Sequence, residues 1–122
     1  ANGFAAPLAG AIGLPRPRTG DAPEPFAFAD PNHVATLLAQ SGWGEAHHER
    51  VDFPYRVGGG DAPLDDAVAF LSRIGPAAAA MRAADGERRA ALRAGLRDYL
   101  ADFERDRAVD LPAAAWLWSV RA

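Results

Sequence analysis

Apolar residues recur at every second position over one short segment of the chain. The apolar set is Val51, Phe53, Tyr55 and Val57, with charged residues or proline between them. Because successive side chains of a strand point to opposite faces, this period places the four residues on one side. The segment from Glu45 to Val57 is therefore predicted to be a strand with one buried face.

A short helix is predicted immediately before this strand. Its apolar residues share one side at i, i+3 and i+4: Val34, Leu37 and Leu38. Asp30 can accept hydrogen bonds from the amides of the first turn, and Pro31 suits the first helical position, where no donor is needed. Gly42 stands where a helix commonly ends with a left-handed residue, so Trp43 is expected to fold back toward Leu38.

The next part of the chain has helical spacing throughout. A first helix, opened by Asp61 and Pro63, has one apolar stripe: Leu64, Ala67, Val68, Leu71 and Ile74. Gly75 and Pro76 are expected to end it, and residues 77–84 form a second short helix. A third helix is predicted from Gly86 to Arg105, with Asp85 as its cap. Its apolar side carries Leu92, Leu96, Tyr99, Leu100 and Phe103, and its arginines are interpreted as a solvated face.

The last segment, from Val109 to Val120, is strand-like and apolar on both faces, which favours a central place in a sheet. We predict that it pairs antiparallel with the strand of Glu45 to Val57, with the helices inserted between them. Near the N-terminus a short helix is expected within Phe4 to Ile12, followed by an extended proline-rich connector from Pro15 to Pro25.

A chain of 122 residues supports a single core, so one domain or part of one is expected. We divide it into an N-terminal helix and connector (1–24), a loop, helix and strand (25–57), a helical insert (58–108) and a last strand (109–122).

The composition of the chain argues against several classes of function. The chain has no cysteine, which excludes disulfides and thiolate chemistry and makes the cytoplasm the default compartment. The net charge is -3, and the arginines are scattered among acids, so no basic stripe for nucleic acid is present. No stretch reaches the roughly 18 apolar residues of a membrane span.

The sequence gives little evidence for a catalytic or metal site. The run Gly58–Gly60 lacks the spacing and the lysine of a phosphate loop and is interpreted as a flexible turn. His47 and His48 are adjacent, so on a strand they point to opposite faces and are interpreted as surface residues. His33 has no evident partner in the sequence. No catalytic residue and no metal ligand is assigned.

Phe26 and Phe28 alternate in the loop before the first capped helix. Two such aromatic residues either fill the core or line an apolar pocket, and the sequence leaves both alternatives open.

The order of these segments resembles the C-terminal part of a class I S-adenosylmethionine-dependent methyltransferase. The similarity is carried by the block PFAFADPNHV (25–34), by Ser41-Gly42-Trp43 after the helix, and by the closing LPAAAWLWSVRA (111–122). Asn2-Gly3-Phe4 stands where the family has an Asn-Pro-Trp-like stretch.

The resemblance implies a Rossmann-like α/β fold, of which this chain holds the sixth and seventh strands, so that alone it would be α+β. It implies methyl transfer from S-adenosylmethionine to a small-molecule acceptor. The implied acceptor-binding residues are Phe26, Phe28, Asn2 and Phe4.

The family's glycine-rich cofactor signature and its acidic ribose ligand are absent from the chain, so no cofactor-binding residue is assigned. We therefore expect a C-terminal portion of a longer enzyme that is inactive as these 122 residues alone. We also expect self-association, or pairing with another chain, through an open edge of the last strand. Two alternatives remain: a non-enzymatic module that binds a ligand or a protein, and a structural fragment without activity.

Overall fold

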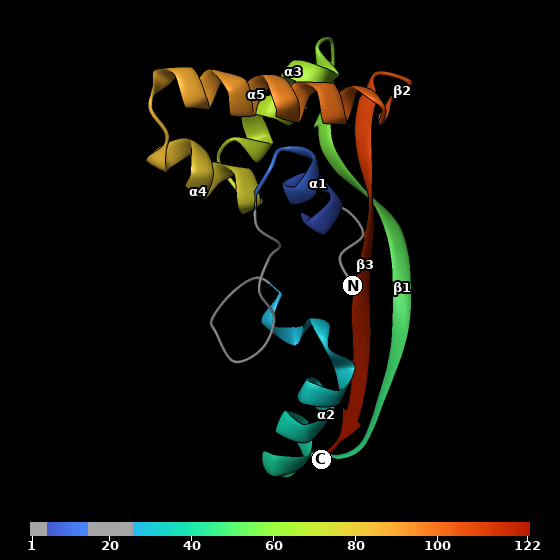
Figure 1. Ribbon diagram of the computed structural model, residues 1–122. Coiled ribbons are helices and arrows are strands. Elements are labelled where there is room, and N and C mark those ends of the chain that lie inside the picture. The colour runs from blue at the N-terminus through green and yellow to red at the C-terminus, as the bar shows by residue number, and fades with distance from the viewer. Residues whose placement is uncertain (1–4, 15–25) are drawn as a thin grey trace. The chain divides into compact units, whose positions relative to one another are not determined.

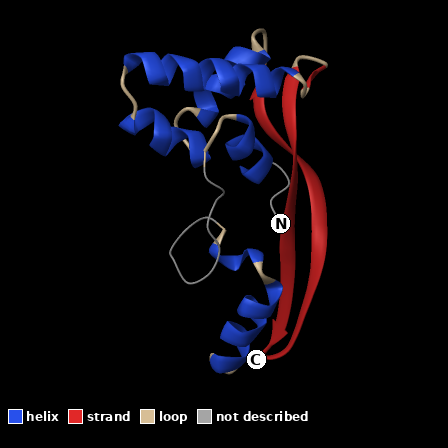
Figure 2. Ribbon diagram, viewed as in Figure 1, coloured by secondary structure: helices blue, strands red, loops and turns tan. Residues whose placement is uncertain are grey.

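The computed structural model describes residues 5–14 and 26–122 and is mixed helix and strand (Figures 1 and 2). In chain order the elements are α1 (Ala5–Ala11), η1 (Ala27–Ala29), α2 (Pro31–Gln40), β1 (Gly44–Gly59), α3 (Pro63–Leu71), α4 (Gly75–Ala83), α5 (Gly86–Ala101), β2 (Glu104–Arg105) and β3 (Ala108–Arg121).

The chain divides into two compact units. Of the described residues, unit 1 comprises 26–53 and Ala113–Ala122, and unit 2 comprises 5–14 and Pro54–Pro112. β1 and β3 each continue from one unit into the other, and the two units are described separately below.

The described strands form one antiparallel sheet in the order β1-β3-β2. β1 and β3 are hydrogen-bonded neighbours, and their arrows run in opposite directions in Figure 1. The predicted pairing is thus confirmed, with α3, α4 and α5 between the two strands in the chain. β3, the strand that is apolar on both faces, is central, as expected.

The third strand, β2, was not predicted. It forms a tight hairpin with β3 in which Glu104 faces Val109 and Arg105 faces Ala108. The two turn residues, Asp106 and Arg107, both have positive φ, 48° and 62°. Such φ values fit the twist of a two-residue hairpin, but the sequence signal for it is normally Asn-Gly or Asp-Gly. The predicted helix from Gly86 to Arg105 therefore ends at Ala101 instead.

The core of unit 2 is built from one side of each helix and the adjoining ends of β1 and β3. Leu8, Leu71, Leu96, Leu100 and Leu111 are all fully buried. The predicted stripe of α5 is confirmed, because its buried residues are Leu92, Leu96 and Leu100, with Tyr99 and Phe103 packed against the cluster. Asp85 caps this helix as predicted, accepting from the Arg88 amide at 2.8 Å.

The stripe of α3 is shorter than predicted. The helix ends at Leu71 rather than Ile74, and Ile74 is exposed. Asp61 does not cap the helix, since Ala62 holds that position without a side-chain hydrogen bond, and Asp61 instead forms an ion pair with Arg107.

The predicted glycine turn is partly a strand. Gly58 and Gly59 belong to β1, and only Gly60, with φ of 82°, lies in the turn. At Gly58 a Cβ atom would lie 2.2 Å from the Pro63 carbonyl oxygen and 2.8 Å from the Ala67 Cβ. This glycine is therefore needed because the start of α3 packs directly on the strand.

The helix of unit 1, α2, has both predicted ends. Asp30 accepts from the Asn32 amide at 2.9 Å. At the other end Gly42 has φ of 87°, and the Trp43 amide donates to the Leu38 carbonyl at 3.0 Å, as in a Schellman motif. No residue of α2 is buried, however, so its apolar stripe lies partly uncovered.

Candidate functional site

The loop that carries the two phenylalanines forms η1, directly before α2. Phe26 is half-buried, and Phe28 is 64% exposed. The exposed fraction separates the two alternatives for Phe28, because a core side chain would be almost completely covered. Phe28 thus does not fill the core of the described residues, and it presents apolar surface next to a helix start.

This loop is held at its C-terminal end by two hydrogen bonds. Asp30 caps α2, as described above, and the indole Nε1 of Trp116 donates to the Ala29 carbonyl at 2.9 Å. The second bond joins the loop to β3, 87 positions further along the chain. Because a covered indole N–H needs an acceptor, the bond fixes the direction in which the chain enters α2.

His33, at the start of α2, lies beside Phe28. The two ring centroids are 6.5 Å apart, and the rings are tilted by 34°. The expectation that this histidine lacks a partner is therefore wrong. The exposed ring of Phe28 thus lies beside the imidazole of His33, which can donate or accept a hydrogen bond.

A second aromatic group lies on the strands of unit 1. The His48 ring is 5.2 Å from that of Trp116, edge to face, and 4.7 Å from that of Trp118. His48, Trp116 and Trp118 therefore share one face of the β1 and β3 pair, in keeping with the alternation along each strand. His47, the preceding residue, lies on the opposite face of the strand, so the two histidines do not form one site.

The other implied acceptor-binding residues, Asn2 and Phe4, lie outside the described residues. Among residues 5–14 and 26–122, no three histidine or acidic side chains are grouped so that they could hold a metal ion. What unit 1 offers chemically is aromatic surface: Phe28 with His33, and the trio of His48, Trp116 and Trp118.

In unit 2, one carboxyl group and one guanidinium group have shifted pKa values. Arg56 donates two hydrogen bonds to Asp110, each 2.9 Å long. These bonds and the charge of Arg56 lower the pKa of Asp110, and the pKa of Arg56 is raised in turn. Partial burial raises the pKa of Tyr99. Arg56 and Asp110 belong to unit 2, whereas the two aromatic groups around Phe28 and His48 belong to unit 1.

Sequence reasoning singled out Phe28 but missed its ring contact with His33 and the hydrogen bond from Trp116 to the same loop. It also missed the contacts of His48 with Trp116 and Trp118. Alternation along a strand places Trp116 and Trp118 on one face, yet nothing local indicates which residue of the other strand faces them. A register between β1 and β3 was required, and the register is a tertiary property.

No helix in the described ranges is both long enough and apolar enough to cross a membrane. Comparison with models of protein families, with curated proteins and with solved structures returned no match to this chain.

Proposed function

We propose that the chain is the C-terminal, acceptor-side region of an S-adenosylmethionine-dependent methyltransferase. In that reaction the methyl group passes from the sulfonium sulfur to a nucleophilic atom of the acceptor, which loses a proton, and S-adenosylhomocysteine is released. The acceptor is a small molecule, and this region contributes apolar contacts to it.

The observation that carries the proposal is the exposed ring of Phe28 on a loop held by the Asp30 cap and by the Trp116 hydrogen bond. A pre-positioned aromatic side chain can orient a bound molecule at little entropic cost. The same loop contains the PFAFADP block, on which the resemblance to the family rests.

The sheet supplies a second line of support. Among the described strands, β2 pairs with β3 only at Ala108 and Val109, so the rest of that edge of β3 has no described strand beside it. An open edge next to Trp116 and Trp118 is suited to pairing with another strand. In the proposed enzyme, the cofactor-binding half supplies that strand.

The decisive experiment uses calorimetry and a methyl-transfer assay on two proteins. The 122-residue chain should show no binding of S-adenosylmethionine or S-adenosylhomocysteine, and the product of the full reading frame should bind both. In that longer protein, Phe28→Ala should lower methyl transfer and leave the cofactor affinity unchanged. Phe28→Tyr, which keeps the ring, should retain most of the activity.

Cofactor binding by the 122 residues alone would contradict the proposal, as would a full-length protein that binds no cofactor. A Phe28→Ala variant that loses stability but no activity would remove the acceptor role of this residue. Because Phe28 is largely exposed, its replacement should change the melting temperature little.

An interaction module without catalysis is the second candidate, and one specific observation favours it. Val51, Phe53 and Leu117 are exposed on the strands of unit 1, and Leu117 is 60% exposed. Exposed apolar groups of this kind commonly mark binding surfaces. Cofactor binding by the longer protein separates the two candidates.

A further inference from the structure

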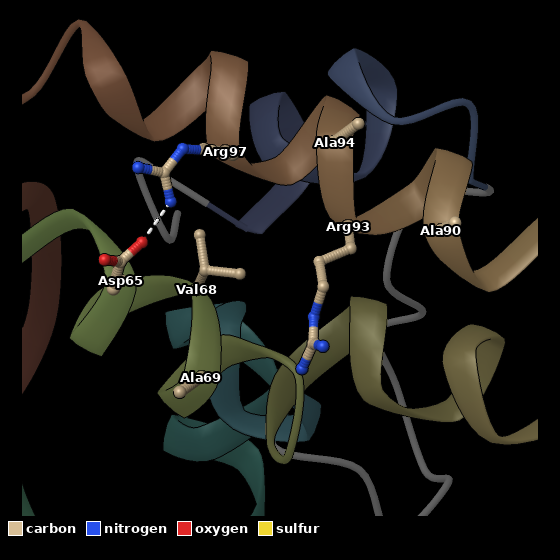
Figure 3. Close-up of a pocket in the computed structure, with 7 residues that line it drawn as sticks. All are labelled: Asp65, Val68, Ala69, Ala90, Arg93, Ala94 and Arg97. Carbon is tan, nitrogen blue, oxygen red and sulfur yellow. Dashed lines mark hydrogen bonds and ion pairs between the residues drawn. The ribbon is translucent and has the colours of Figure 1, made fainter.

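A groove of about 490 Å³ runs between α3 and α5, within unit 2 (Figure 3). Its lining comes from one side of each helix: Asp65, Val68, Ala69, Ala90, Arg93, Ala94 and Arg97. The α3 residues follow i, i+3, i+4 spacing and the α5 residues follow i, i+3, i+4, i+7 spacing. Both helices thus turn a continuous side toward the groove.

The groove is open because its apolar residues are small. The leucines of α5 that fill the core, such as Leu96, lie on another side of the helix and are fully buried. Where α3 and α5 meet at the groove, Ala69, Ala90 and Ala94 leave space that larger side chains would fill. Ligand sites of small molecules are commonly apolar and of this volume, with a few polar groups that fix orientation.

The arginines of α5 differ in their hydrogen-bond and ion-pair partners. Arg89 donates to the carbonyls of Met81 and Ala84 and so satisfies the end of α4. Arg97 forms an ion pair with Asp65 across the groove. The arginines of α5 are exposed, as predicted for a solvated face, and Arg89 and Arg97 also have the partners described above.

Arg93 is different from both. Its side chain reaches into the groove in Figure 3, and no described residue accepts a hydrogen bond or forms an ion pair with it. The lining carries two arginines and one aspartate, so its formal charge is one positive unit. The groove thus combines an apolar floor with one uncompensated guanidinium group.

We propose that this groove binds a small amphipathic carboxylate, with its aliphatic part against Val68, Ala69, Ala90 and Ala94 and its carboxylate on Arg93. A guanidinium group presents two parallel N–H donors that match the two oxygens of a carboxylate. One carboxylate compensates the one positive unit of the lining. The ion pair of Arg97 with Asp65 is exposed and therefore weak, so Arg97 can turn to the same carboxylate.

This proposal does not depend on methyl transfer. It concerns residues other than those of the loop that carries Phe26 and Phe28. It holds whether the chain belongs to an enzyme or is an interaction module. Its test therefore uses the 122-residue chain and binding alone.

The experiment is an NMR titration of the chain with octanoate, followed on the alanine methyl groups and the arginine Nε–H groups. Octanol and octylammonium serve as ligands of similar shape without the negative charge, and inorganic phosphate as an anion without the chain. We expect saturable shifts at Ala69, Ala94 and Arg93 with octanoate. The three control ligands should bind at least about tenfold more weakly, because each lacks one of the two contacts.

Four variants test the assignment of the site. Arg93→Gln should weaken octanoate binding by about tenfold or more, as expected for loss of a charge-assisted hydrogen bond. Arg88→Gln, on the same helix but outside the groove, is the matched control and should have no effect. Asp65→Asn should strengthen binding, because it releases Arg97, and Ala94→Leu should abolish binding by filling the floor.

Ala94 is exposed, so the leucine variant is expected to fold, and its amide spectrum checks this. The proposal would be overturned by octanoate shifts that spread over all arginines. It would also be overturned if binding were equally strong in Arg93→Gln, or if octanoate did not bind in the millimolar range.

Discussion

Apolar residues that alternate along β1 and β3 are buried in unit 2 but exposed in unit 1. In unit 2, Val57 and Leu111 are buried at 4% and 0% exposure. In unit 1, Phe53 and Leu117 continue the same alternation along the same two strands, and yet they are 39% and 60% exposed. Alternation determines which residues share a face of a sheet. Whether that face is covered depends on the elements that pack on it.

The difference extends beyond the strands. Of the buried hydrophobic residues described, all except Ala113 belong to unit 2. Of the exposed large hydrophobic residues described, all except Ile74 belong to unit 1. Unit 2 has the core of a stable domain, whereas unit 1 presents apolar surface that another protein surface can cover. The comparison gives three predictions.

The largest effect is expected when a core leucine is truncated. Leu96→Ala removes a fully buried side chain from α5 and should lower the free energy of unfolding by about 2–5 kcal/mol. Leu37→Ala in α2, where the side chain is 37% exposed, is the matched change in unit 1 and should cost less than about 1 kcal/mol. Urea unfolding followed by circular dichroism measures both. Equal losses would show that the two units do not differ in packing as described.

An intermediate effect is expected at Gly58. Gly58→Ala would place a methyl group 2.2 Å from the Pro63 carbonyl oxygen and 2.7 Å from the Ala67 amide nitrogen, so the start of α3 must move. We expect a loss of about 1–3 kcal/mol, as for other overpacked sites. The neighbouring Gly59→Ala is the control, because no atom lies within 4 Å of its added Cβ. If thermal unfolding gave the same midpoint for both variants, the close contact of α3 with β1 would be refuted.

The smallest effect is expected from the ion pair of Arg56 with Asp110 in unit 2. Arg56 lowers the pKa of Asp110 in the folded protein below its unfolded value. The pair therefore stabilises the fold above the unfolded pKa, and this contribution is lost as the pH falls through the lowered folded pKa. Both side chains are partly exposed, so solvent screens the interaction.

An NMR titration of the Asp110 carboxyl carbon should give a pKa below the usual aspartate range. Arg56→Gln should return this pKa to its usual range and make the acid side of the stability curve less steep. A pKa for Asp110 that is the same in both proteins would contradict the pairing.

Local chemistry allowed most helix starts to be predicted from the sequence. Asp30 and Asp85 cap α2 and α5 because a carboxylate next to free amides is favourable in any context. Gly42 ends α2 for an equally local reason. The pairing of β1 with β3 was also predictable, because only two long segments had strand patterns.

Only the tertiary structure decided the features that depend on residues distant in the chain. The β2 hairpin forms with Asp106 and Arg107 at positive φ, against their local preference, because pairing with β3 compensates for it. Position 58 requires glycine because α3 packs against it. The Trp116 side chain is held by its hydrogen bond to the Ala29 carbonyl, far away in the chain. Periodicity in the sequence defines the faces of helices and strands, but burial is decided by contacts between elements, which no local pattern encodes.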